Sequence, residues 1–409
     1  MPSVCLYFQV HQPIRIKKYK IFDVGLDHSY FNDKSSSNLN NELILSKVAS
    51  KAYLPANEIL LFLLKKYKEF KISFSFSGIF LEQAQKLKPE VISSFRKLVK
   101  TGKVEVLSET YHHTLAFFYS KREFERQVAK HSQLVKKLFG VTPSVFRNTE
   151  LAYNNDLSSW AEKKGYKAIL AEGWDTFLGW RSPNFVYKPK ASKKIKLLLK
   201  NYKLSDDIAF RFSEKSWREW PLTAEKFAGW ISAINGCGQI VNLFMDYETF
   251  GEHQWKDKGI FEFLAALPPA ILKNSDNDFI TPGAAVEKYM AMDVIDVPYV
   301  VTWADSERDL SAWIGNSIQK SAIEFIYGLE KDVLKTKNKK IIDDWRKLQT
   351  SDHFYYMCTK WFSDGDVHKY FNPYESPYDA FISFMNVAKD LELRINGLIK
   401  SSKNKFKNS

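Results

Sequence analysis

The chain has 409 residues, of which 45% are hydrophobic and 15% aromatic, and its 60 Lys and Arg against 47 Asp and Glu give a formal net charge of +13. This composition excludes a disordered, collagen-like or low-complexity chain, because it can supply a full-sized core. The basic residues gather in polar stretches without any nucleic-acid-binding motif, so we expect no nucleic-acid partner and treat the charge as surface character. These stretches are 188–203, 331–340 and 400–407.

Cysteine usage and the first residues bear on the compartment. Three cysteines at wide spacing argue against a disulfide framework and against a cysteine-based zinc site. The opening MPSVCLYFQVHQP lacks the basic segment and cleavage site of a signal peptide. No window approaches 18 consecutive apolar residues. We therefore expect a cytoplasmic protein with no membrane partner.

Short apolar runs alternate with amphipathic segments up to about residue 290. Pro89 suits a first helical turn, Asp156 is a candidate N-cap, and Gly140 and Gly165 are typical helix ends. The predicted helices are 57–67, 89–99, 120–139, 157–164, 225–234 and 284–289. The predicted strands are 4–10, 72–77, 104–107, 144–147, 167–171, 208–212, 239–245 and 279–281.

The order of these elements predicts the fold class. Nearly continuous apolar strands that alternate with helices are typical of a parallel sheet covered on both faces. Seven or eight such units indicate an α/β barrel or partial barrel. After residue 300 only helices are predicted, at 312–334, 340–360 and 378–399. We therefore expect a barrel over residues 1–295 and a helical domain over residues 296–409.

Two long segments, 13–41 and 174–203, read as loops. Long loops in compact domains commonly form lids or binding loops. Both follow predicted strands, so we expect them to leave the end of the sheet where such folds place their sites.

Polar side chains follow four of the predicted strands. The carboxyl ends of barrel strands meet at one face, so we expect these side chains to converge there. Two carboxylates from different strands, flanked by His, Arg and aromatic residues, suit the cleavage of a glycosidic bond. The residues are Gln9, His11 and Gln12; Glu109, His112 and His113; Arg147 and Glu150; and Asp246, Glu248, Glu252 and His253.

A metal site is the rival interpretation of this cluster. Four of its histidines, together with the acids, could bind zinc. However, the chain has no HExxH motif, and the adjacent pair His112–His113 points its two rings in different directions. A serine nucleophile is weaker still, because no G-x-S-x-G motif is present. We therefore expect neither a metal nor another cofactor.

Five blocks, in order, carry a resemblance to glycoside hydrolase family 57, close to its archaeal-type alpha-amylases. The most specific are FRNTEL and DYETFGEH, which lie about 100 residues apart. The likeness runs from residue 1 to about 320. The blocks are 11–13 (HQP), 102–113 (GKVEVLSETYHH), 146–151 (FRNTEL), 246–253 (DYETFGEH) and 309–316 (DLSAWIGN).

The resemblance implies an incomplete parallel (β/α)7 barrel with a helical C-terminal region, and a retaining mechanism on alpha-glucans or malto-oligosaccharides. Glu150 matches the family's nucleophile and Asp246 its general acid/base. His11, Glu109 and His113 match positions that line the sugar site. In the fifth block we rely on Trp313 rather than on Asp309, because the spacing varies there.

The remaining candidates follow from chemistry. Arg147 or His11 could hold Glu150 ionised. Gln12 and His253 belong to the motif blocks and are candidate substrate contacts, with Glu248 and Glu252 as their possible support. Indole rings can stack on sugar rings, although ordinary packing is an equal alternative for each of them. The candidate platforms are Trp174, Trp255, Trp303 and Trp313.

Three other functions stay open at this point. A 4-alpha-glucanotransferase would use the same carboxylates with a sugar as acceptor. A metal-dependent polysaccharide deacetylase also uses an incomplete barrel, but it needs an Asp–His–His metal triad, which we do not find. A non-catalytic carbohydrate-binding protein would tolerate the loss of Glu150, so the presence of this residue counts against it.

Overall fold

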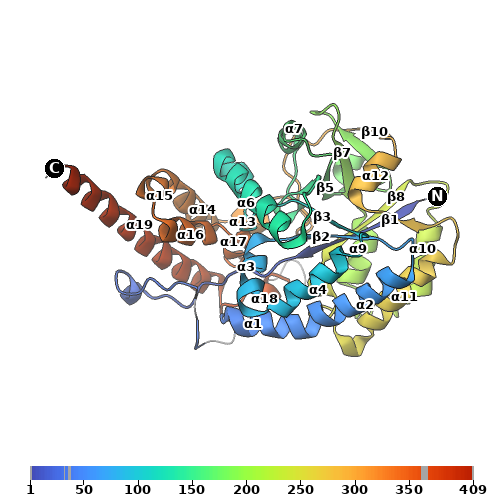
Figure 1. Cartoon of the computed structure of the whole chain (residues 1–409), viewed down its shortest axis with the longest axis horizontal. Helices are drawn as coiled ribbons and strands as arrows, with labels where there is room; N and C mark the ends of the chain where they lie inside the picture. Colours follow the sequence, from blue (N-terminus) through green and yellow to red (C-terminus); the bar gives the residue numbers. More distant parts are fainter. Residues whose placement is uncertain (1, 32, 36–37, 361–366, 408–409) are drawn as a thin grey trace. The chain divides into compact units, whose positions relative to one another are not determined.

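The computed structural model describes the chain apart from residues 1, 32, 36–37, 361–366 and 408–409 (Figure 1). It divides into two compact units, each built from separate stretches of sequence. The sheet unit comprises Met1–His11, Leu45–Thr110 and Val128–Trp303. The helical unit comprises Gln12–Ile44, Tyr111–Gln127 and Ala304–Ser409. The domain boundary at residue 295 stays a prediction.

The sheet unit holds two five-stranded sheets in which every pairing is parallel except that of β6 with β7. The first sheet has the order β3-β2-β1-β8, with β9 paired to β1. The second has the order β10-β6-β7-β5-β4. The predicted α/β class with parallel strands is confirmed. The strands are β1 (Ser3–Val10), β2 (Ile72–Phe76), β3 (Val104–Val106), β4 (Val145–Arg147), β5 (Ala168–Glu172), β6 (Val186–Pro189), β7 (Lys196–Lys200), β8 (Ile240–Asp246), β9 (Asp278–Phe279) and β10 (Asp293–Ile295).

The two sheets are linked at both margins by a few hydrogen bonds. Ser108, just after β3, forms a parallel bridge with Phe146 of β4. At the other margin, the N–H of Asn201 donates to the Asn242 carbonyl of β8 at 2.9 Å, and the Asn242 side chain donates to the Leu199 carbonyl at 2.9 Å. The described strands therefore follow one another in the order β8-β1-β2-β3-β4-β5-β7, without continuous strand pairing at these two margins.

The inner faces of both sheets share one apolar core. Because side chains alternate along a strand, every second residue points inward. Parallel strands also need cover on their outer faces, which is why helices flank these sheets. Core residues include Cys5, Tyr7, Leu107, Val145, Ala168, Leu170, Leu198, Ile240 and Phe244.

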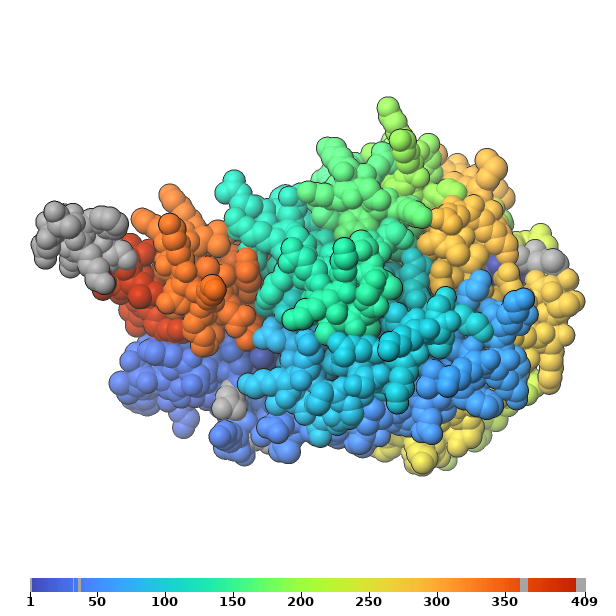
Figure 2. Space-filling model, viewed as in Figure 1, coloured from blue at the N-terminus to red at the C-terminus, as the bar shows by residue number. Residues whose placement is uncertain are grey.

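Helices cover the sheets from outside. α2 packs against α4 and α11, and α11 packs against α10. In the space-filling view the α2–α4 region, blue to cyan, forms much of the visible surface of the sheet unit (Figure 2). The helices of eight or more residues that lie wholly in this unit are α2 (Leu54–Lys66), α3 (Gly78–Leu87), α4 (Pro89–Val99), α7 (Asn155–Lys163), α9 (Tyr202–Ala209), α10 (Ala224–Ser232) and α11 (Ile260–Leu272). A shorter helix, α12 (Pro282–Lys288), contacts β1 and β5.

The helical unit confirms the predicted helical C-terminal region. Its longest helix, α19, contacts α14, α15 and α16. No helix in the described ranges is long and apolar enough to cross a membrane. The helices after residue 300 are α13 (Ser311–Ile314), α14 (Ser317–Gly328), α15 (Glu330–Thr336), α16 (Lys339–Lys347), α17 (Ser351–Tyr355), α18 (Val367–Phe371) and α19 (Pro377–Lys407). Two earlier helices, α1 (Asn41–Val48) and α6 (Lys121–Phe139), cross the boundary between the units.

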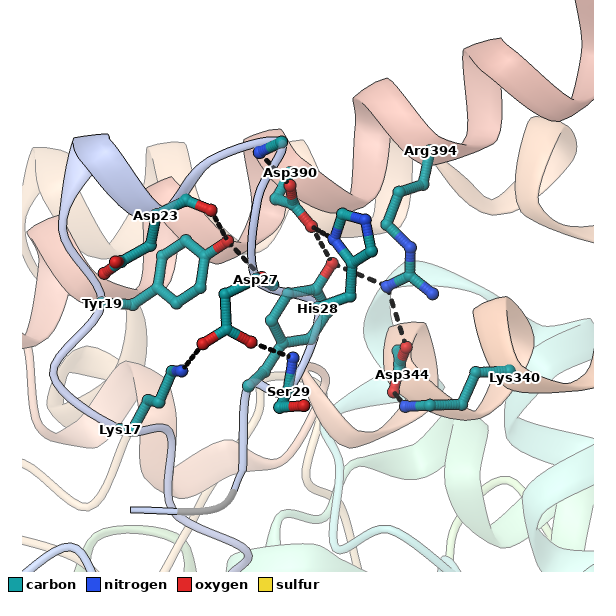
Figure 3. Close-up of polar contacts among 12 residues, drawn as sticks. Lys17, Tyr19, Asp23, Asp27, His28, Ser29, Lys340, Asp344, Asp390 and Arg394 are labelled. Carbon is teal, nitrogen blue, oxygen red and sulfur yellow. Dashed lines mark hydrogen bonds and ion pairs between the residues drawn. The ribbon is translucent and has the colours of Figure 1, made fainter. Parts of the chain in front are cut away.

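The predicted loop 13–41 is fastened to α19 within the helical unit (Figure 3). The buried carboxylate of Asp390 accepts hydrogen bonds from the Gly25 N–H at 2.6 Å, from His28 Nδ1 at 2.8 Å and from the Tyr30 hydroxyl. Arg394 donates to the Tyr30 hydroxyl at 2.7 Å. The segment around residues 25–30 is thus held by charged groups of one helix.

Several predicted elements were wrong. Residues 208–212 are not a strand, because α9 occupies Tyr202–Ala209 and begins where the Asn201 side chain accepts from the Leu204 N–H at 3.1 Å. This N-cap outweighs the β-propensity of Ile208. The predicted helix 312–334 is split into α13, α14 and α15, and 340–360 into α16 and α17.

Two further corrections concern the region after β4. The cap of α7 is Asn154, whose side chain accepts from the Leu157 N–H at 3.1 Å, and not Asp156. The segment 174–203 is not a loop throughout, because it contains β6 and β7. The lysines at both ends of β7 give the segment a polar composition, although its three central leucines are buried as in a strand.

Candidate active site

The carboxyl ends of the strands carry the predicted polar residues of the sheet unit. Asp246 ends β8 and Arg147 ends β4, while His11 and Glu109 lie just beyond β1 and β3. In the sheet register, Gln9 of β1 pairs with Asp246 on one side. The strand-end rule therefore brings these side chains to one face of the sheets, as the sequence predicts.

A buried network fixes Glu109. The Nε2 of Gln9 donates to Glu109 Oε1 at 3.0 Å. The Oε1 of Gln9 in turn accepts from the Tyr7 hydroxyl at 2.9 Å and from Ser75 Oγ at 2.8 Å. Because Glu109 is fully buried, this support fixes the direction of its carboxylate.

His131 supports the same segment from α6. Its Nε2 lies 2.8 Å from the Phe76 carbonyl, and its Nδ1 lies 3.4 Å from the backbone nitrogen of Glu109. A carbonyl can only accept and an N–H can only donate, so the ring carries its proton on Nε2. Burial lowers the pKa of His131, in keeping with a neutral ring that positions Glu109.

The Tyr7 hydroxyl lies among three charges from different strands. Burial is the main cause that raises the pKa of Tyr7, and the negative charges of Glu109 and Asp246 raise it further. The positive charge of Arg147 acts in the opposite direction. The ends of β3, β4 and β8 therefore converge around one phenol of β1.

Glu150 lies in a strained turn directly after β4. Its φ is 59° and that of Leu151 is 50°, so two successive non-glycine residues occupy the left-handed region. Such residues cost roughly 1 kcal/mol or more each and persist only where their surroundings hold them. Trp303 does so: its Nε1–H donates to Glu150 Oε2 at 2.8 Å, and its backbone N–H donates to the Glu150 carbonyl at 3.3 Å.

Arg147 is a fully buried cation next to the same indole. Its Cζ lies 4.8 Å from the centroid of the Trp303 ring. Among the residues that the structure describes, none of its guanidinium nitrogens has a hydrogen-bond partner. A buried charge without hydrogen-bond partners is costly, and through the shared indole this arginine adds positive potential on the Glu150 side of the site.

Asp246 has a second carboxyl group close to it. Glu248 is buried, and burial followed by the charge of Asp246 raises its pKa to about 8. The Glu248 Oε1 accepts from the backbone N–H of His11 at 3.3 Å and from the Tyr53 hydroxyl. The His11 ring lies 2.6 Å from Ser77 Oγ through Nδ1. Glu248 therefore joins the loop after β8 to the end of β1.

His253 and Glu252, which follow each other in the loop after β8, differ in their charge state and their contacts. Loss of water around the half-buried ring lowers the pKa of His253 to about 4, so this side chain is neutral at pH 7. Glu252, whose side chain is largely buried, pairs with the exposed Lys47 at 2.5 Å. Its predicted supporting role at the site therefore has a structural alternative.

Three further predicted residues are part of the other unit. Gln12, His113 and Trp313 belong to the helical unit. There, Gln12 accepts from Arg15 at 3.4 Å, and the His113 carbonyl accepts from the Ser351 N–H at 2.9 Å.

The four candidate tryptophans are in different settings. Trp313 is buried, with its ring centroid 6.0 Å from that of Tyr355, which is ordinary packing. Trp174 is half-buried at the start of α8 (Asp175–Leu178). Trp255 is 53% exposed. Trp303 contacts a predicted catalytic residue, because its indole N–H donates to Glu150.

The family model for glycosyl hydrolase family 57 matches residues 5–298. The chain belongs to this family. The resemblance read from the five motif blocks is thereby confirmed, and the protein is a glycoside hydrolase.

Relatives of this family 57 enzyme fit the assignment. It is 41% identical over 406 residues to a Methanocaldococcus jannaschii protein named "Putative alpha-amylase", with 97% of this chain and 85% of that protein aligned. A family 57 branching enzyme from Pyrococcus horikoshii superposes with a TM-score of 0.68 at 15% identity, over 90% and 87% of the two chains. A 4-alpha-glucanotransferase from Thermococcus litoralis superposes at 0.63 and 16%, over 86% of this chain and 56% of that one. The structural likenesses establish the shared fold.

Two residues of this family 57 site escaped the sequence analysis. Glu172 ends β5 and Lys200 ends β7, and both are buried. The Nζ of Lys200 lies 3.6 Å from Glu172 Oε2 and 5.7 Å from the Trp303 ring centroid. The strand-end rule finds Glu172 once β5 is extended by one residue, but it misses Lys200 because β7 was read as a loop.

The alternative interpretation of the strand-end cluster is a metal site built from histidines and acids. Within the described ranges, no three or more His, Cys, Asp or Glu side chains are grouped so that they could hold a metal ion. The histidines that made such a site conceivable have other contacts, such as that of His11 with Ser77.

Proposed function

We propose that this enzyme cleaves alpha-1,4-glucosidic bonds in alpha-glucans with retention of configuration, with Glu150 as nucleophile and Asp246 as general acid/base. The observation that carries the proposal is the position of Arg147. It contacts the indole that donates to Glu150, and it lies close enough to the Tyr7 hydroxyl to lower its pKa, which Asp246 raises. The two carboxylates thus belong to one charged cluster.

The reaction proceeds in two displacements. A Glu150 carboxylate oxygen attacks the anomeric carbon while the glycosidic C–O bond breaks, and Asp246 gives its proton to the departing oxygen. The resulting glycosyl ester is then attacked by water, which loses its proton to the Asp246 carboxylate, and the Glu150–sugar bond breaks. Retention requires the two carboxyl groups to lie roughly 5–5.5 Å apart.

The surroundings suit these two roles. Glu150 must be ionised, and the Trp303 N–H and the positive charge of Arg147 both favour its charged form. Asp246 must carry a proton in the first step. Burial and the negative charge of Asp246 raise the pKa of Glu248 to about 8, so the coupled pair, rather than either group alone, binds a proton near neutral pH.

The name of the Methanocaldococcus jannaschii relative supports an alpha-amylase type of substrate. A 4-alpha-glucanotransferase is the alternative on the same scaffold, because only the acceptor, water or sugar, differs between the two. We place the enzyme in the cytoplasm, with no nucleic-acid or membrane partner, as the sequence predicts. The roles of His11, Glu109, His113, His253 and the other predicted sugar contacts belong to the same proposal.

The test uses maltoheptaose with the wild type and with Glu150→Gln and Asp246→Asn. We expect shorter oligosaccharides from the wild type, initially as the alpha-anomer by NMR, and a loss of about 10³-fold or more in both variants. Glu287→Gln is the matched control, because this carboxylate is exposed and pairs only with Lys167 in the described contacts.

Three outcomes separate the alternatives. Products longer than maltoheptaose indicate transfer to a sugar acceptor. Activity in Glu150→Gln equal to that of the wild type would rule out the nucleophile assignment. Loss of activity with a chelator would favour the metal-dependent interpretation.

A further inference from the structure

Lys200 is a buried lysine for which neither the motif blocks nor the family match gives a role. It ends β7, is 4% exposed and lies among three groups of the sheet unit. Its Nζ is 2.9 Å from Asp206 Oδ1 and 3.6 Å from Glu172 Oε2. The same atom lies 5.7 Å from the centroid of the Trp303 ring.

Lysine is rarely buried this deeply unless it is paired. The two carboxylates explain how the charge is tolerated, but not why a cation stands next to the indole. Trp303 already has one cation, Arg147, at 4.8 Å. Two cations near one indole hold the ring by its electron-rich face and withdraw electron density from it, which strengthens the N–H as a donor.

The backbone around Lys200 is built for close contact. In the sheet register, Lys200 pairs with Glu172. A Cβ on Gly173 would lie 2.2 Å from the Lys200 carbonyl oxygen, so only glycine lets the chain after β5 pass here. The Gly173 N–H donates to Glu172 Oε1 at 2.8 Å, which fixes the carboxylate that faces Lys200.

We propose that Lys200 is a positioning residue that acts through Trp303 to keep the Glu150 carboxylate oriented and ionised for attack. The proposal rests on the catalytic role of Glu150 proposed above. The chain of contacts runs from Lys200 to the Trp303 ring and from the Trp303 Nε1–H to Glu150 Oε2. Lys200 itself need not touch the substrate.

The ionisation of Glu150 depends on all the charges of the sheet unit around Trp303 and the strand ends. Removing one of the positive charges disfavours the carboxylate form, so the acid limb of activity moves to higher pH. The charged groups are Arg147 (β4), Glu172 (β5), Lys200 (β7), Asp206 (α9), Asp246 (β8) and Glu109, which follows β3; the neutral Tyr7 hydroxyl (β1) and the titratable Glu248, which follows β8, lie beside them.

The test compares Lys200→Met and Lys200→Arg with Lys196→Met. Lys196 is a matched control at the other end of β7, where its Nζ donates to two carbonyls, at 2.6 and 2.7 Å. For Lys200→Met on maltoheptaose we expect kcat to fall about tenfold with KM nearly unchanged. The acid limb of kcat should rise by about half to one pH unit. Lys200→Arg should restore both, and Lys196→Met should alter neither.

A double-mutant cycle with Trp303→Phe decides whether Lys200 acts through the indole. If it does, Lys200→Met causes no further loss in the Trp303→Phe background. Full additivity, or an unmoved acid limb in Lys200→Met, would overturn the proposal.

A further variant separates a folding defect of Lys200→Met from an effect on Glu150. Lys200→Met/Glu172→Gln removes the buried carboxylate left behind, so a folding defect of the single variant is relieved. Its acid limb is compared with that of Glu172→Gln alone, because the loss of the Glu172 charge itself favours the ionised form of Glu150. We expect the limb of the double variant to lie at the higher pH; if the two limbs coincide, Lys200 has only a structural role. The proposed function fails separately, through undiminished activity of Glu150→Gln, whichever way the Lys200 variants behave.

Discussion

Arg147 and Glu248 of the sheet unit have surroundings opposite to those of Glu123 and Asp390 of the helical unit, although other buried charges of the sheet unit, such as Lys200, are paired. In the helical unit, Glu123 receives two hydrogen bonds from Arg346, at 2.6 and 3.1 Å, and Asp390 receives three from the loop that it holds. In the sheet unit, Arg147 is fully buried without a hydrogen-bond partner for its guanidinium among the described residues. Glu248, in the same unit, is driven toward its neutral form.

This difference distinguishes charges that stabilise the fold from charges that are available for a reaction. A paired buried charge fixes a fold, because breaking the pair leaves an uncompensated ion. An unpaired or neutralised group keeps electrostatic energy available for a reaction, and such groups collect at functional sites. The contrast therefore supports, independently of any motif, the proposal that the reaction takes place at the strand ends of the sheet unit.

The largest expected effect is on the stability of the helical unit. Arg346→Met leaves the fully buried Glu123 without its bidentate partner, so we expect the free energy of unfolding to fall by about 3–5 kcal/mol. The kcat of the remaining folded enzyme should not change. Denaturant unfolding measures the first quantity and initial rates the second. The control is Arg122→Met, because Arg122 is exposed on α6, the helix that carries Glu123. Its free energy of unfolding should stay within about 0.5 kcal/mol of that of the wild type.

The second prediction reverses this pattern in the sheet unit. Arg147→Met should lower kcat by about 10²-fold, because the positive potential near Glu150 is lost. The free energy of unfolding should stay level or rise, because a costly buried ion is removed. A destabilisation as large as that of Arg346→Met would show that the proposed contrast between the units is wrong.

The third prediction concerns pH and Glu248. Between about pH 4.5 and 8 the folded chain holds a proton on Glu248 that the unfolded chain has released, so stability falls as pH rises. His253, with a pKa of about 4, acts in the opposite direction only below about 6.5. From pH 6.5 to 8, Glu248 should therefore make the free energy of unfolding of the wild type fall by about 1.4 kcal/mol per pH unit. This contribution should be absent in Glu248→Gln.

Denaturant unfolding at a series of pH values measures this slope as the difference between variant and wild type. The exposed Glu287→Gln serves again as the control, because its pKa is lowered and it does not titrate in this range. Parallel curves for wild type and Glu248→Gln would mean that Glu248 is ionised in the folded enzyme.

Most of the strand framework could be predicted from the sequence, because strands buried on both faces are nearly continuous in apolar residues. β1 and β8 are examples. β7 could not, since Lys196 and Lys200 give it the composition of a loop while its three central leucines are buried. Nor did local propensity show that Asn201, rather than a strand, governs residues 202–209.

The candidate site divides along the same line. Residues that follow recognisable strands, such as Glu109, Arg147 and Asp246, could be found by position alone. The contact of Trp303 with Glu150 could not, because the partners are 153 residues apart and an indole is equally suited to stack, to pack or to donate. Lys200 was hidden by the missed strand on which it lies.

The pairing of β1 with β8 also bears on how the chain is made. β1 can pair with one of its parallel neighbours only after β8 has been synthesised. The helical unit can complete its fold only later, because the Gly25 N–H donates to Asp390, which is 365 residues away in the sequence. Such non-local contacts slow folding and expose strand edges during synthesis. We expect the nascent chain to require protection until α19 has emerged.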